Sequence, residues 1–91
     1  MYRGYSDMIF ARRLRMFRLQ ASLTQHHLAD QMTAAGYHMA NSAISNIESG
    51  KRLVTIGEAV QFAAALGIPL LALVTDGPPH DLIEAQAAPW R

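Results

Sequence analysis

With 91 residues, 51% of them hydrophobic and 16% charged, the chain can bury one small hydrophobic core but not two. It has no cysteine, which excludes a disulfide framework and a zinc site built on thiolates, and fits a reducing compartment. The net charge of +1 is unevenly spread: residues up to Val54 carry seven Lys/Arg against three Asp/Glu (+4), and the rest carry one against four (−3), which favours a polyanionic partner.

Five helices are predicted, and no segment shows the sustained alternation of a strand. The first covers residues 7–21 with Ser6 as its N-cap, and the second follows Thr24 as N-cap and ends at Gly36. Their apolar residues recur at helical spacing: Phe10, Leu14, Phe17 and Ala21 in the first helix, and Leu28, Ala29 and Met32 in the second.

The third predicted helix runs from near Asn41 to Glu48 or Ser49, before Gly50. Ile44 and Ile47 are expected to face inward. The opposite face combines two pairs of neighbours four residues apart, and its members are Asn41, Ser42, Ser45 and Asn46. Amides and hydroxyls can donate to and accept from base edges without the nonspecific attraction of a formal charge, so this face is suited to the major groove of DNA.

The fourth helix is predicted to start at Thr55, which has capping-box spacing to Glu58, and to end at Gly67. Pro69 then starts a short fifth helix. The expected apolar stripe of the fourth helix consists of Ile56, Ala59, Val60, Ala63 and Leu66, and the fifth helix contains Leu70, Leu71, Leu73 and Val74. Residues 1–76 are therefore expected to form one domain, and residues 77–91 a C-terminal tail.

Three segments, "LTQHHLADQM", "SAISNIESGKR" and "EAVQFAAALGIPLLAL", occur in this order, and together they resemble the phage-repressor-like, or xenobiotic-response-element, helix-turn-helix family. The resemblance covers roughly residues 9–75. It implies an all-α, lambda-repressor-like domain of five helices and a transcriptional regulator, expected to be a repressor, that binds specific double-stranded DNA. The "TAAGYH" stretch makes the turn about five residues longer than in the ordinary motif, which is similar to actinobacterial and actinophage members.

The resemblance also implies roles for individual residues. Gln25 is expected to contact a phosphate, Asn41 to read a base, and Lys51 and Arg52 to hold the DNA backbone. Ser42, Ser45 and Asn46 match the remaining groove-facing positions. Tyr37 and His38 could add contacts from the extended turn, and Arg18 is expected to form a structural ion pair with Glu48.

Several alternatives accompany this interpretation. The polar face could be merely solvated, and the protein could be a protein-interaction module such as an antitoxin whose tail binds a protein partner. His26 and His27 are adjacent and point about 100° apart on a helix, so no metal site is expected. No nucleophile elbow or phosphate loop is present, so neither an enzyme activity nor a cofactor is expected.

The distribution of apolar residues also leads to expectations about the oligomeric state and the cellular location. A homodimer through the fifth helix and the tail is expected, because four large apolar residues cannot all face inward on one short helix; the alternative is a monomer that uses the extended turn. No apolar run reaches the ~20 residues of a membrane span, and no secretory signal is visible. The expected location is the cytoplasm, at the bacterial nucleoid or in the host cytoplasm if the protein is phage-encoded.

Overall fold

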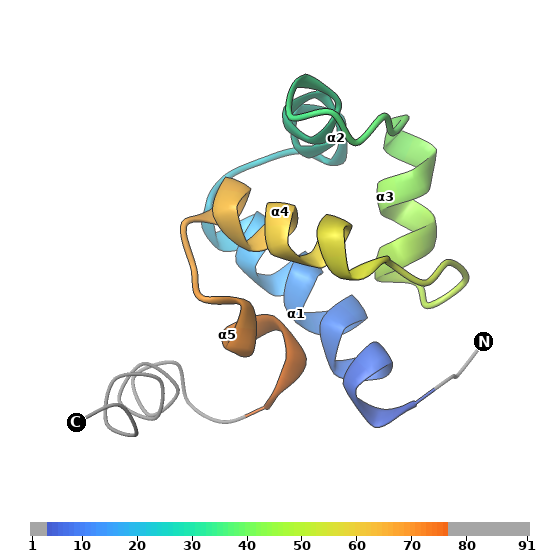
Figure 1. Cartoon of the computed structure of the whole chain (residues 1–91), viewed down its shortest axis with the longest axis vertical. Helices are drawn as coiled ribbons and strands as arrows, with labels where there is room; N and C mark the ends of the chain where they lie inside the picture. Colours follow the sequence, from blue (N-terminus) through green and yellow to red (C-terminus); the bar gives the residue numbers. More distant parts are fainter. Residues whose placement is uncertain (1–3, 77–91) are drawn as a thin grey trace.

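The fold is seen in a computed structural model that describes residues 4–76. All regular elements of this range are helices, which confirms the expected all-α, five-helix architecture (Figure 1). The helices are α1 (Tyr5–Gln20), α2 (Gln25–Ala34), α3 (Asn41–Glu48), α4 (Ile56–Leu66) and α5 (Leu70–Val74). The predicted tail, residues 77–91, lies outside the described residues.

Side-chain caps start two of the five described helices, α2 and α4. The Thr24 Oγ1 accepts a hydrogen bond from the backbone N–H of His27 at 3.0 Å, and Thr55 and Glu58 form the complete capping box that starts α4. The prediction for α1 was wrong at both ends. The helix begins at Tyr5 after Gly4, so that Ser6 lies inside it, and the exposed Ala21 lies beyond its last residue.

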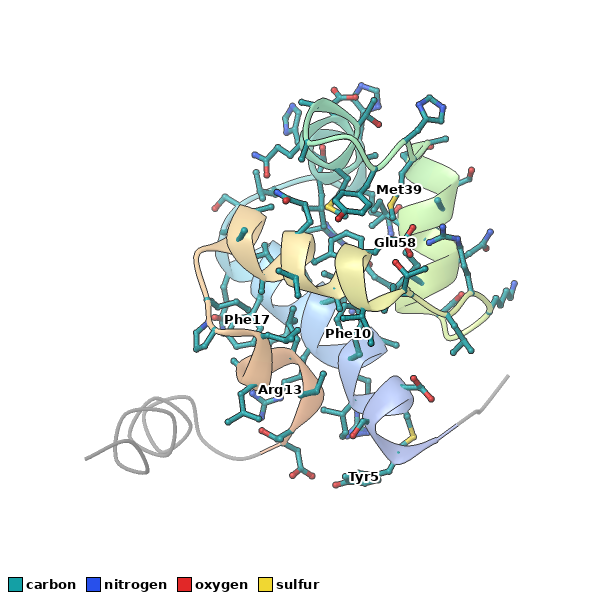
Figure 2. All side chains as sticks on the ribbon, viewed as in Figure 1. Tyr5, Phe10, Arg13, Phe17, Met39 and Glu58 are labelled. Carbon is teal, nitrogen blue, oxygen red and sulfur yellow. The ribbon has the colours of Figure 1, made fainter. Side chains whose placement is uncertain are left out.

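The core forms around α1, which contacts α3, α4 and α5, while α2 packs against α3 and α4. Phe10 of α1 (labelled in Figure 2) meets Phe62 of α4 edge to face, with ring centroids 6.0 Å apart. The largest fully buried side chains come from every helix: Ile9, Leu14, Leu28, Met32, Ile44, Ile47, Phe62 and Leu73. In Figure 1, α3 lies at one edge of the molecule. Its buried Ile44 and Ile47 belong to the core that the other helices also form.

The inward face of α4 differs from the predicted one. Ile56 and Val60 are 83% and 50% exposed, whereas Ala59, Phe62 and Ala63 are buried. Positions 59, 62, 63 and 66 have the same helical spacing as the predicted stripe, and α4 is apolar on most sides, so spacing alone cannot select the face. The large ring of Phe62, which the predicted stripe omits, lies in the core and fixes the rotation of the helix.

The leucines of α5 are more deeply placed than expected. Leu73 is fully buried, and Leu70, Leu71 and Val74 are partly buried against the same core. This short helix packs against both α1 and α4, so residues on more than one of its sides find apolar neighbours. The expected surplus of exposed apolar surface on α5 is therefore reduced.

The extended connection between α2 and α3, residues 35–40, is tied to both helices. Gly36 has a φ of 98°, which suits glycine at the end of a helix. The Thr33 hydroxyl donates to the Met39 carbonyl and accepts from the Met39 N–H, both at 3.1 Å. Met39 is buried, so the added residues form a closed turn that holds the start of α3 in place.

Within residues 4–76, no helix is long and apolar enough to cross a membrane.

Candidate nucleic-acid interface

The outer face of α3 presents neutral hydrogen-bonding groups on a firmly seated helix. Ile44 and Ile47 are 0% and 2% exposed and fix the helix to the core. The four expected groove-facing residues are all exposed: Asn41, Ser42, Ser45 and Asn46. Within residues 4–76 no side-chain hydrogen bond occupies their amide and hydroxyl groups. The face can therefore offer both donors and acceptors to a ligand.

The end of α3 is fixed by an ion pair with α1. The Arg18 Nε donates to Glu48 Oε2 at 2.7 Å and Nη2 donates to Oε1 at 3.0 Å, while the side chains are only 8% and 4% exposed. The third guanidinium nitrogen, Nη1, donates to the Leu23 carbonyl at 2.9 Å. The hydrogen bond to Glu48 raises the pKa of Arg18, so the guanidinium stays charged. The structure thus contains the expected ion pair, which also reaches the α1–α2 connection.

Gln25, expected to contact a phosphate, opens α2 beside this pair. Its Nε2 donates to Glu48 Oε1 at 3.1 Å, and the side chain is half-buried. A primary amide carries two N–H groups and one carbonyl oxygen, so this bond leaves one donor for another partner. The contact fixes the direction of the amide, a role that the sequence did not indicate.

The two cations after α3 have different surroundings. The backbone N–H groups of Lys51 and Arg52 both donate to the Asn46 carbonyl, at 2.8 and 3.1 Å, so the loop folds back onto the end of α3. The Lys51 side chain is exposed. The Arg52 Nη2 donates to Glu58 Oε2 at 3.0 Å, and Nη1 is buried with no hydrogen-bond partner among the described residues.

Glu58 therefore has two functions, because Oε1 accepts from the Thr55 N–H in the capping box and Oε2 holds Arg52. The capping-box role could be predicted from the sequence, because Glu58 lies three residues after Thr55. The pairing with Arg52 depends on how the loop folds, and was not predicted. Lys51 is consequently the freer of the two expected backbone contacts.

The extended turn contributes one exposed and one packed residue. His38 is exposed just before α3. Tyr37 is half-buried and packs against the core. Its hydroxyl lies so close to Gly57 of α4 that a Cβ at position 57 would stand 2.9 Å from it. Tyr37 therefore packs between the turn and α4, and its DNA contact stays a prediction.

The described range shows no metal-binding cluster: no group of three or more His, Cys, Asp or Glu lies close enough to hold an ion.

Comparison with known families adds one match. A family model described as a helix-turn-helix domain matches residues 9–74, which extend from α1 to the end of α5. Neither the curated proteins nor the solved structures gave a match.

Proposed function

The chain belongs to the helix-turn-helix domain family, and from this membership and the outer face of α3 we propose that it is a transcriptional regulator that binds specific double-stranded DNA and acts as a repressor. The observation that carries the proposal is the polar face of α3. Four exposed amide and hydroxyl side chains cover a helix that is seated by the buried Ile44 and Ile47. A helix of this kind fits the major groove, where base edges present donors and acceptors.

The roles divide by chemistry. Asn41 and Asn46 contact base edges, because an amide can form a bidentate pair with adenine. Ser42 and Ser45 add single hydrogen bonds to bases or to the backbone. Lys51, exposed beside the end of α3, contacts a phosphate.

The residues that flank α3 differ in how many of their hydrogen-bonding groups are already used within the protein. Gln25 contacts a phosphate with the N–H that Glu48 does not use. His38 reaches the backbone from the extended turn. Arg52 supports the loop through Glu58 and contributes to the phosphate region mainly by its long-range charge.

We also propose that two chains bind together. A single recognition helix contacts only a few base pairs, so two-fold related half-sites about one helical turn apart would supply the length of a specific site. A dimer through α5 and the tail follows from the sequence, but α5 places its apolar side chains largely in its own core. The stoichiometry on DNA therefore tests the dimer more directly than variants of α5 do. The protein would act in the cytoplasm, without a catalytic activity of its own.

The proposal is tested by selecting bound duplexes from random DNA. We expect an enriched sequence motif with the parent chain and loss of that motif with Asn46→Ala. The matched control is Gln20→Ala, which removes an exposed amide at the end of α1 and should leave the motif unchanged. A failure of the parent chain to enrich any motif would contradict sequence-specific binding. A saturated complex of one chain on an asymmetric motif would contradict the dimer alone.

A further inference from the structure

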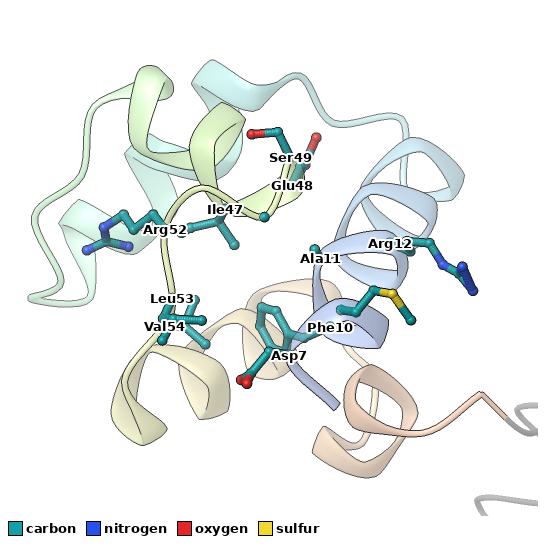
Figure 3. A pocket seen from close by; sticks show the side chains of 12 residues that line it. Asp7, Phe10, Ala11, Arg12, Ile47, Glu48, Ser49, Arg52, Leu53 and Val54 are labelled. Carbon is teal, nitrogen blue, oxygen red and sulfur yellow. The ribbon is translucent and has the colours of Figure 1, made fainter. Parts of the chain in front are cut away.

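An apolar groove lies between α1 and the segment that leads from α3 into α4 (Figure 3). It consists of two adjoining hollows of about 250 and 160 Å³. Both are lined by Asp7, Phe10 and Val54, so they lie next to each other. The larger hollow extends to Arg52, and the smaller one extends to Val74 at the end of α5.

Large apolar side chains are exposed on the rim of this groove. Ile56 lines the smaller hollow and is 83% exposed, the highest value among the large hydrophobic residues of the described range. Leu53 lines the larger hollow and is 47% exposed. Val60, four residues after Ile56 on the same side of α4, lines neither hollow but is also 50% exposed. Large exposed apolar side chains beside a groove are typical of a surface that another segment covers.

We propose that the occupant is the chain's own segment 77–91. The described range ends at Asp76, whose carboxylate accepts a hydrogen bond from the Tyr5 hydroxyl. This bond holds the end of the range beside the start of α1, two residues after Val74 and therefore at the mouth of the groove. The segment that follows carries three large apolar residues, Leu82, Ile83 and Trp90. Six residues can span roughly 20 Å when extended, so Leu82 is within reach of the groove.

Tethering favours this segment over a second copy of the chain. A segment joined to the mouth of its own groove by a few residues has an effective concentration in the millimolar range, so it competes well with free chains at micromolar concentration. The large apolar side chains of the segment match the apolar lining of the groove, which includes Phe10, Val54 and Ile56. The larger hollow is lined by two acidic and two basic side chains, so charge does not distinguish the two occupants.

The one tryptophan of the sequence, Trp90, makes the proposal measurable in the full chain. We expect blue-shifted emission that is protected from a soluble quencher. Ile56→Ser, at a position that the described range leaves 83% exposed, should shift the emission to the red and restore quenching. Leu19→Ser is the matched control: Leu19 is 52% exposed on α1 and lines neither hollow, so its loss should change nothing.

Circular dichroism of both variants checks that their helices are intact. In the parent chain, nuclear Overhauser effects between the Ile56 methyl groups and the Trp90 indole protons test the contact independently. Quenching of Trp90 as efficient as in a free peptide would overturn the proposal. Protection that survives Ile56→Ser would place the segment elsewhere and overturn it as well. Protection that disappears on dilution would show that the occupant comes from a second copy. None of these results depends on DNA, so they test this proposal separately from the proposed function.

Discussion

Breaking the buried Arg18–Glu48 ion pair should destabilise the domain far more than breaking an exposed ion pair would. The two side chains are 8% and 4% exposed and share hydrogen bonds of 2.7 and 3.0 Å. Arg18→Met would leave the Glu48 carboxylate buried with the Gln25 amide as its one side-chain hydrogen-bond partner in residues 4–76, and the Leu23 carbonyl would lose its guanidinium donor. Removing one partner of a buried pair costs roughly 3–5 kcal/mol.

This loss is a large fraction of the free energy of unfolding of a small domain. A domain of this size is stabilised by roughly 5–15 kcal/mol, and each kcal/mol shifts the melting temperature by roughly 4–8 °C. We therefore expect Arg18→Met to lower the Tm by at least about 12 °C, measured by circular dichroism at neutral pH. Arg15→Met, an exposed arginine of the same helix, is the control and should stay within a few degrees of the parent.

A double variant separates charge from packing. Arg18→Met combined with Glu48→Leu removes both charges, and replacement of a buried pair by apolar side chains is often nearly neutral. The double variant should therefore regain part of the Tm that Arg18→Met loses. The reasoning is refuted if Arg18→Met melts with the parent, or if the double variant loses the sum of the two single effects.

Three further predictions concern the interface and its support. Asn46→Ala should cost about 1–3 kcal/mol on the selected site and little on random DNA, whereas Lys51→Ala should weaken both and lower the salt dependence by about one unit of slope; identical profiles in salt titrations would refute the distinction. Glu58→Gln should lower the stability by roughly 1 kcal/mol, seen in urea unfolding, because it weakens the α4 capping box and frees the loop cation; an unchanged midpoint would count against this double function. Gly57→Ala should destabilise by roughly 1 kcal/mol or more, because the new Cβ meets the Tyr37 hydroxyl at 2.9 Å, and the cost should shrink in a Tyr37→Phe background; equal costs in both backgrounds would exclude this contact.

Local signals made most of the secondary structure predictable. Thr24 caps α2, and Thr55 with Glu58 forms the capping box of α4, because a side chain three residues away is enough to satisfy the first N–H groups of a helix. The inward face of α3 could also be predicted from the sequence. Ile44 and Ile47 are the only large apolar residues of this short polar helix, so only one face can pack against the core.

The features that were not predicted depend on contacts between distant residues. The face of α4 is ambiguous in the sequence, and the position of Phe62 against Phe10 decides it. The same holds for the candidate site: Tyr37 turns toward Gly57, and Arg52 pairs with a residue of the next helix. The Tyr37 hydroxyl and the Arg52 guanidinium could both form hydrogen bonds with DNA. Only the folded turn and loop show that these side chains also contact α4.

Site-directed crosslinking can show whether the outer face of α3 enters the major groove. The chain has no cysteine, so Asn46→Cys introduces a single thiol on that face. Gln20→Cys introduces one at the end of α1 as the control. Each variant is offered the selected duplex with a tether on the major-groove side of a base; the tether ends in a mixed disulfide, from which the cysteine thiolate displaces a small thiol. We expect efficient disulfide formation with Asn46→Cys and background levels with Gln20→Cys. Equal crosslinking by the two variants, or none above background with Asn46→Cys on a duplex that the parent chain binds, would contradict this expectation.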